Sequence, residues 1–275
     1  MSMGLSVIAQ IEFDNQVKAA YQAAGKLRCH VRLKSGVVGG TATFYRSSRG
    51  VATPRLPQTD VTPMGTSYTP VVATLTDWNA PEYTDVFDQQ KTGVQERGVV
   101  ANNIAMAIGR REDQMILDAL DAANASANIV HGSVGLTDAK MRRAQAIFDA
   151  RAVPMGKRKM AISARAKEDL LGDARFSSRD YVESYVIRTG KLPPIYGFDI
   201  EIIEERDEGG LPLASTTRTN FAWDADAIGL AVGLETGVKV DWIPEKTSWL
   251  ANKLFVAGAV PIDPLGVLEI ETTEA

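Results

Sequence analysis

The chain has 275 residues, with 30 basic and 34 acidic side chains and a formal net charge of −4. Hydrophobic residues make up 45% of it and charged residues 23%, the composition of a folded protein with a sizeable core. The charge balance excludes an overall cationic signature for gripping nucleic acid. Cys29 is the only cysteine, which excludes an intrachain disulfide and a thiolate metal cluster. No apolar run approaches the roughly 18 residues of a membrane span.

The first predicted element is a short amphipathic helix over residues 10–24, with Phe13, Val17 and Tyr21 on one side and Gly25 as its stop. It has too little apolar surface to be stable alone, so it needs a host surface on its own or a neighbouring subunit. Residues 26–36 alternate apolar and basic side chains, which predicts a strand. Its basic face either meets a partner or is simply solvated.

Residues 37–80 contain two strand-like runs, Gly40–Arg46 and Thr69–Trp78, on either side of the proline-rich stretch Ser47–Tyr68. That stretch has almost no hydrophobic periodicity. Structureless loops longer than about 12–15 residues are uncommon in compact domains and are usually functional or disordered. Ser47–Tyr68 is therefore either an arm that reaches another molecule or an ordinary surface loop.

A long helix is predicted over Thr92–Ala123, where no proline interrupts the sequence and Thr92 and Gln95 have the form of a capping box. Gly109 is the position at which a kink is most expected. The helix is either an ordinary core helix or a spine along which an elongated subunit is built. Its apolar stripe consists of Val100, Ile104, Ile108, Met115 and Ala119.

Beyond a polar linker at 124–135, short helices and strands alternate. Helices are expected at Asp138–Arg151, at Ala164–Leu171 and from Ser177 to Gly190. An exposed acidic loop is expected at Glu205–Gly210. Strands are expected at Met160–Ser163, Phe198–Glu204, Ala225–Val232, Gly237–Ile243, Trp249–Ile262 and Gly266–Glu271.

Catalytic and metal-binding motifs are scarce. His30 and His131 are the only histidines, and each is more typical of a surface or structural residue than of a general base. Neither a metal-ligand spacing nor a phosphate-binding loop is present. Asp224 with Asp226, and the carboxylates of Glu204–Glu208, are weak cation-site candidates that are better read as solvated groups. No cofactor and no enzymatic activity are expected.

Four stretches in a particular order resemble the major capsid protein of tailed bacteriophages, of the Hong Kong 97-type fold. They are the strand–arm–strand at 37–80, which resembles the extended loop; Ala107–Leu120 (AIGRREDQMILDAL), which resembles the spine helix; Val153–Ile202, similar to the axial domain; and Trp249–Glu271, similar to the closing strands. None is a sharp motif, and the specificity lies in their order and spacing.

The resemblance implies an α+β fold with four parts: an N-terminal arm at 1–36, an extended loop at 37–80, a peripheral domain at 81–135 and 249–275, and an axial domain at 136–248. The family has no catalytic residues to carry over. The candidate contacts between subunits are Phe13, Tyr21, Arg46, Arg49, Arg55, Asp60, Arg110 and Arg111.

The function implied is that of a virion protein which assembles as homopentamers and homohexamers into an icosahedral shell around double-stranded DNA, bound without sequence specificity. No long scaffold extension precedes residue 10, so a separate scaffolding protein is expected, together with a portal protein, no membrane partner, and assembly in the bacterial host cytoplasm. Two alternatives remain: an encapsulin-like compartment shell that packages protein cargo, and an enzyme that uses Ser47–Tyr68 as a lid.

Overall fold

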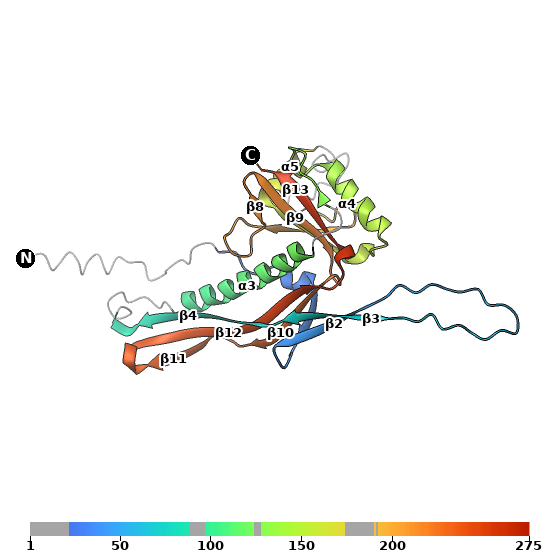
Figure 1. Cartoon of the computed structure of the whole chain (residues 1–275). Coiled ribbons are helices and arrows are strands. Elements are labelled where there is room, and N and C mark those ends of the chain that lie inside the picture. The colour runs from blue at the N-terminus through green and yellow to red at the C-terminus, as the bar shows by residue number, and fades with distance from the viewer. Residues whose placement is uncertain (1–21, 88–96, 124–127, 174–189, 191, 275) are drawn as a thin grey trace, which may run out of the picture.

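The computed structural model describes residues 22–87, 97–123, 128–173, 190 and 192–274. The molecule is elongated (Figure 1): the hairpin of β2 (Thr41–Ser47) and β3 (Tyr68–Thr74) projects from one end, and β11 (Lys239–Ile243) lies at the other. A second body, which contains the C-terminus, sits beside this long axis. The chain thus folds as two packed bodies with one projecting hairpin.

The first body is built on a sheet ordered β1–β10–β12–β11, in which β4 also pairs with β12. Its central strand β12 is 14 residues long and pairs antiparallel with β10, β11 and β4. Strand β1, in contrast, is parallel to β10. The remaining strand bounds are β1 Arg32–Ser35, β4 Thr76–Asp85, β10 Ile228–Glu235 and β12 Ser248–Pro261.

The predicted long helix is present as α3 (Arg97–Ala122), which lies along this sheet (Figure 1). It runs without interruption through Gly109, the position at which a kink was most expected. The predicted apolar stripe is buried against the sheet: Ile108, Met115 and Ala119 share a core with Phe255 and Ala257 of β12, and Val100 and Ile104 form a smaller cluster with Ala251. Helical spacing alone therefore identified the buried face. The predicted cap at Thr92 and Gln95 lies outside the described residues.

The second body has a sheet ordered β5–β13–β9–β6–β7, with β8 paired to β9. Helices α4 (Asp138–Ala150) and α5 (Ala164–Gly172) pack on it around a separate core that includes Phe148 and Phe198. Ser163 caps α5 by accepting a hydrogen bond from the Ala166 amide. The strands of this body are β5 Asn128–Ile129, β6 Arg158–Ser163, β7 Asp199–Ile203, β8 Leu213–Ala214, β9 Thr217–Asp224 and β13 Val267–Thr273. Short 3-10 turns in the chain are η2 Met155–Lys157, η3 Pro244–Lys246, which joins β11 to β12, and η4 Pro264–Gly266.

Two sequence expectations about local structure are wrong. Leu27–His30, expected in a strand, is the 3-10 turn η1, because the amides of Lys26 and Leu27 bond to the side chain of Asp113. The loop Glu205–Gly210, expected to be exposed, folds back onto α3, and Gly209 is buried there. Tertiary contacts override local pattern in both places.

Strand β9 was not expected from the sequence, and Ala225–Val232, expected as one strand, is a turn followed by the start of β10. The inward-facing positions of β9 include Arg218, Asn220 and Asp224, which are buried polar residues. Their side chains find partners in the fold, such as the Ile270 carbonyl for Asn220. A strand that buries polar groups carries no apolar alternation to detect.

The sheets divide the chain differently from the expected domain ranges. Strand β13 lies within 249–275, expected in the peripheral domain, yet it belongs to the second sheet; β10 and β11 lie within 136–248 but belong to the first. Residues 22–35, expected in the N-terminal arm, pack onto the first body, where Leu27 is fully buried. The chain crosses between the two bodies more often than the expected ranges allow, since those ranges return the chain to the peripheral domain only once, at residue 249.

Candidate functional site

The projecting hairpin is the most exposed feature of the described chain. Its strands pair antiparallel from Thr41 with Thr74 to Ser47 with Tyr68, and the Ser48 amide bonds to the Ser67 carbonyl at 2.8 Å. Every residue from 45 to 70 is exposed. The exposed apolar side chains of this stretch include Val51, Leu56 and Val61, each about 70% exposed. The extended loop, defined here as residues 48–67, therefore buries almost nothing within its own subunit.

The base of the hairpin is firmly packed. Phe44 and Ala42 of β2 and Leu75 after β3 form a small core with Ile262 and Ala231. A side chain at Gly229 of β10 would collide with the Phe44 ring, since a β-carbon there would lie 2.8 Å from it. Burial of such a cluster is worth several kcal/mol at about 25 cal/mol per Å². The body of the subunit thus fixes the direction in which the loop leaves.

The predicted contact residues of the loop differ in their surroundings. Arg46 is tied to its own subunit, because its guanidinium lies 3.2 Å from the Asp263 carboxylate. Arg49, Arg55 and Asp60 are exposed and have no charged partner among the described residues. Arg46 and Arg49 line a shallow cleft of about 350 Å³ at the base of the hairpin. Of these four predicted contact residues, Arg49, Arg55 and Asp60 keep their charges free for another molecule.

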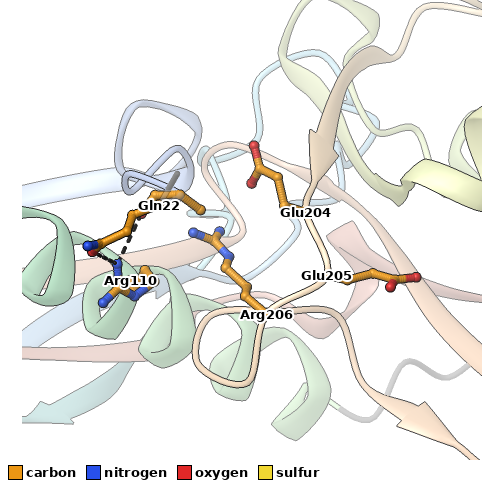
Figure 2. Close-up of a pocket in the computed structure, with 6 residues that line it drawn as sticks. Gln22, Arg110, Glu204, Glu205 and Arg206 are labelled. Carbon is orange, nitrogen blue, oxygen red and sulfur yellow. Dashed lines mark hydrogen bonds between the residues drawn. The ribbon is translucent and has the colours of Figure 1, made fainter. Parts of the chain in front are cut away.

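The predicted residues of the long helix are engaged inside the subunit. Arg110 donates to the Gln22 side chain at 3.2 Å and to the Ala23 carbonyl at 3.4 Å (Figure 2). Arg111 stacks on Trp78, 3.7 Å from the ring centroid, and lies 3.6 Å from Glu208. Contacts of either arginine with another subunit remain a prediction. Phe13 and Tyr21 lie outside the described residues.

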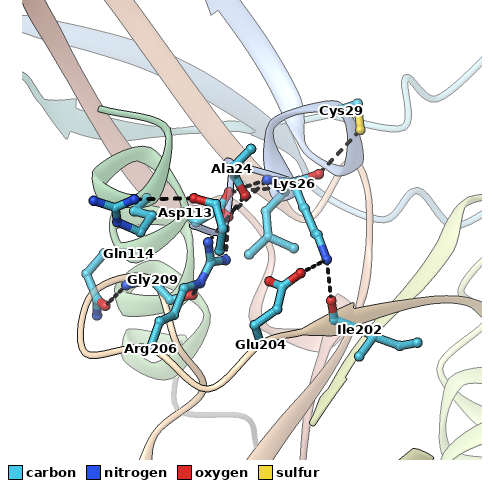
Figure 3. A network of polar contacts seen from close by, with 12 residues as sticks. Ala24, Lys26, Cys29, Asp113, Gln114, Ile202, Glu204, Arg206 and Gly209 are labelled. Atoms are coloured by element: carbon cyan, nitrogen blue, oxygen red, sulfur yellow. Dashed lines mark hydrogen bonds and ion pairs between the residues drawn. The ribbon is translucent and has the colours of Figure 1, made fainter. Parts of the chain in front are cut away.

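A second notable feature is a polar junction at the middle of α3 (Figure 3), which the sequence analysis did not identify. Asp113 is fully buried there and accepts hydrogen bonds from the amides of Lys26 and Leu27, at 2.9–3.0 Å. Arg206 pairs with the same carboxylate at 2.7 Å. Asp113 lies one turn from both Gly109 and Leu117 on the packed face of the helix. A carboxylate at that helical spacing is the sequence feature that could have indicated a buried charge.

The junction is extended by three further contacts. Lys26 pairs with Glu204 and donates to the Ile202 carbonyl at 2.9 Å (Figure 3). Gln114 accepts from the Gly209 amide at 2.7 Å. An open pocket of about 430 Å³ lies alongside, lined by Gln22, Ala23, Arg110 and Glu204–Arg206 (Figure 2). Two segments far apart in sequence, 22–27 and 202–209, therefore meet on about one turn of α3.

Next to this junction Glu112 is buried with an unusual charge environment. Burial raises its pKa to about 7, partly offset by the positive charge of Arg28, while the carboxylates of Glu235 and Asp113 raise it further. Arg28 lies 3.5 Å from Glu112 but only 2.9 Å from Glu235, its closer partner. Glu112 keeps one carboxylate oxygen that is buried and without a hydrogen bond. Glu112 is therefore a buried carboxyl group whose charged form is disfavoured by its surroundings.

The described residues hold no arrangement suited to metal binding: no group of three or more His, Cys, Asp or Glu side chains could hold an ion. Asp226 pairs with Lys157 at 2.7 Å, and His131 bonds to the Ser133 amide and to Thr273. His30 lies 3.4 Å from Glu201. Within the part of the chain that the structure describes, no helix is both long and apolar enough to cross a membrane.

Comparison with known proteins agrees with this picture. A family model described as phage capsid protein matches residues 5–274. The fold is similar to a chain of the capsid of the cyanophage P-SCSP1u, with a TM-score of 0.77 and 13% identity over 96% of this chain and 92% of that one. It is also similar to a chain from the head of Helicobacter pylori bacteriophage KHP40 (TM-score 0.73, 10% identity, 95% and 94% covered).

A chain from Mycobacterium phage Che8 is similar as well, with a TM-score of 0.70 and 18% identity over 94% of this chain and 95% of that one. At such low identity these structures establish the fold, a mixed helix-and-sheet fold shared with phage capsids, and the family model establishes the kinship. No curated protein sequence matches the chain.

Proposed function

The chain belongs to the phage capsid protein family, and on that premise we propose that it builds an icosahedral shell from pentamers and hexamers around double-stranded DNA. Membership makes the protein a major capsid component of the virion, structural and not enzymatic, that associates with copies of itself. It favours a virion shell over the two alternatives, an encapsulin-like compartment and an enzyme with a lid loop.

One observation carries the proposed assembly: a fully exposed loop of 20 residues on a rigid base. Residues 48–67 bury almost no surface in their own subunit, yet Phe44 and its neighbours aim them in one direction. A segment without a core of its own becomes ordered when it lies on a partner. Laid on the next subunit, repeated by symmetry, such loops close a shell through many individually weak contacts.

Loop charges contribute little to the strength of this contact. Arg49, Arg55 and Asp60 are free to meet charges on the next subunit, and exposed ion pairs give only about 0–1 kcal/mol each. The exposed apolar residues Val51, Leu56 and Val61 offer more, at roughly 25 cal/mol per Å² covered. We therefore assign the loop's binding energy mainly to the apolar area that it covers on the next subunit. The arginines act mainly by fixing the position of the loop on that subunit.

The two bodies correspond, in this proposal, to the parts of a Hong Kong 97-type subunit. The first body, with α3 and the sheet centred on β12, is the peripheral domain, and the second body, with α4, α5 and β13, is the axial domain. The residue ranges follow the sheets and not the linear boundaries expected from the sequence. In this proposal the N-terminal arm ends before residue 22, because residues 22–27 already bond to the junction around Asp113.

The remaining partners follow from charge and family. A net charge of −4 opposes tight binding to phosphate, so the packaged DNA is held by confinement and without sequence specificity. A separate scaffolding protein and a portal protein complete the assembly, which takes place in the host cytoplasm. These partners belong to the proposal and rest on kinship.

The test is assembly of purified protein, alone and with the scaffolding protein from the same phage. We expect rings, tubes or closed shells by negative-stain electron microscopy and a fast-sedimenting fraction by ultracentrifugation. A folded protein that stays monomeric at high concentration under both conditions would contradict the proposal.

A further inference from the structure

The segment 22–27 crosses the middle of α3 and is held there largely through its main chain. The carbonyl of Ala23 accepts from Arg110 at 3.4 Å, and that of Ala24 accepts from Arg206 at 3.3 Å. The amides of Lys26 and Leu27 donate to Asp113. Two cations thus bind consecutive carbonyls, and one anion binds consecutive amides just beyond them (Figure 3).

Side chains of this segment add little apolar anchoring before Leu27. Ala23, Ala24 and Gly25 have almost no side chain to bury, and Ala24 and Gly25 are exposed. Gly25 instead brings its backbone against that of Gly109 on α3, where a β-carbon on either residue would come within 2.8 Å of the other. Only Leu27 is fully buried. The segment is therefore attached by main-chain bonds and by the polar side chains of Gln22 and Lys26, followed by a single apolar anchor.

The groups that hold the segment are themselves fixed. Asp113 is fully buried and the Arg206 side chain is 7% exposed, and the two are paired at 2.7 Å. Arg206 also donates to the Gly209 carbonyl at 2.9 Å, which ties it to its own loop. A buried charge pair with all its hydrogen bonds satisfied has one low-energy geometry and is costly to disturb.

We propose that Arg110, Asp113 and Arg206 form a main-chain clamp whose role in assembly is to position the chain where it enters the subunit at residue 22. Arg110, Asp113 and Arg206 are positioning residues: they act on residues 22–27 and touch no other subunit in this role. The clamp fixes the position and direction of residues 22–27 on α3. The inference rests on the proposed shell function for its assembly readout, but the clamp itself is testable in the unassembled subunit.

The clamp is tested by hydrogen exchange of unassembled subunits, followed in a peptide that covers residues 22–28. Asp113→Asn keeps the side-chain shape but removes the charge, and we expect the Lys26 and Leu27 amides to exchange at least tenfold faster. Asp121→Asn, an exposed change of the same kind on the same helix, is the matched control and should leave exchange unchanged. Ala24→Ser should also leave exchange unchanged, because the clamp bonds to the main chain of Ala24 and not to its side chain.

Arg110→Gln provides a second variant in case Asp113→Asn does not fold, since Arg110 is only half-buried and is not part of the buried pair. It should speed exchange in the same peptide while leaving the melting temperature within about 2 °C of the parent. The yield of closed shells is then measured for every folded variant. The expected result is faster exchange together with a several-fold loss of closed shells in the clamp variants alone.

Other results separate the two ideas. Unchanged exchange in Asp113→Asn, or in Arg110→Gln if the former does not fold, overturns the clamp. Faster exchange with normal shells overturns its positioning role and leaves the proposed function intact. If the parent and the Asp121→Asn control also fail to assemble with the scaffolding protein, the proposed function fails, and with it the assembly role, whatever the exchange data show for the contacts.

Discussion

The main chains of Gly25 and Gly109 lie in contact: a β-carbon on Gly25 would be 2.7 Å from the Gly109 carbonyl oxygen, and one on Gly109 would be 2.8 Å from the Gly25 amide nitrogen. No side chain could be accommodated at either position without moving a backbone. The glycine that weakens α3 in isolation is therefore the residue that lets the N-terminal segment approach it.

This contact reverses the usual effect of a helix glycine. Gly109→Ala should stabilise a free helix by about 1 kcal/mol, yet in the subunit it should destabilise by roughly 1–3 kcal/mol, because the new methyl group overpacks against Gly25. Denaturant unfolding monitored by circular dichroism measures the change. Gly237→Ala, where a β-carbon meets nothing within 4 Å, is the control. A more stable Gly109→Ala protein would refute the contact.

The extended loop should be dispensable for folding. Ser47 pairs with Tyr68, so replacing residues 48–67 by Asn-Gly gives a two-residue hairpin turn of the favoured type. Since residues 45–70 are all exposed, the melting temperature should change by less than about 3 °C, and a shorter loop costs less closure entropy. Closed shells should be lost.

A full-length loop in which Val51, Leu56 and Val61 are changed to Ser separates loop length from loop chemistry. We expect it to assemble poorly too, since those side chains supply most of the area to be covered. Normal shells from the Asn-Gly variant would mean that the loop is only a connection. Failure of that variant to fold would place the loop in the core.

Glu112 makes stability depend on pH in a direction that can be tested. Its pKa in the folded protein is about 7, above the ordinary 4.5, so the folded state binds a proton more tightly than the unfolded state. Stability should therefore fall as pH rises from about 4.5 to 7 and stay low above 7. The difference corresponds to roughly 3 kcal/mol at most.

Glu112→Gln should remove this dependence. At pH 8 the variant should be more stable than the parent by about 1–3 kcal/mol, and at pH 5 the two should differ little, because both then carry a neutral side chain. Urea unfolding at several pH values measures both slopes, with the exposed Glu82→Gln as control. Equal slopes in parent and variant would show that Glu112 does not titrate in this range.

Glu274 should anchor the last strand. Its carboxylate accepts from Arg218 at 2.9 Å and from the Ser163 hydroxyl, and the Arg218 side chain is almost fully buried. Glu274→Ala leaves that guanidinium without its best partner, which should cost about 2–3 kcal/mol in the free energy of unfolding. Glu245→Ala, a change at an exposed turn, should cost less than about 0.5 kcal/mol. Equal effects would refute the anchor.

The sequence predicted those parts of the fold that depend on local pattern. The apolar stripe of α3 identified both the helix and its buried face, and the proline-rich stretch between two strand-like runs identified the exposed loop almost to the residue. Strand β9 was missed because Arg218, Asn220 and Asp224 occupy its inward positions. Their partners lie on distant strands, which no local window contains.

The candidate site divides in the same way. Arg49, Arg55 and Asp60 remain predicted contacts, and their exposure follows from their place in the loop. Arg110 and Arg111, whose contacts with another subunit stay a prediction, bond to Ala23 and stack on Trp78 within the subunit, partners 87 and 33 positions away in the chain. Asp113 was passed over because a lone carboxylate in a helix is ordinarily solvated, and only the fold brings the Lys26 and Leu27 amides to it.

Phe44, at the base of the hairpin, packs directly against Gly229 of β10, so this contact sets the angle at which the hairpin leaves the subunit. Because β10 pairs with β12, and β12 packs against α3, the base of the hairpin is connected to the long helix through two adjacent strands. A larger residue at position 229 would push on the Phe44 ring and change this angle, while leaving the loop chemically unchanged. Subunits with such a change would carry every contact residue and yet present them at a different angle, so we expect shells of altered curvature.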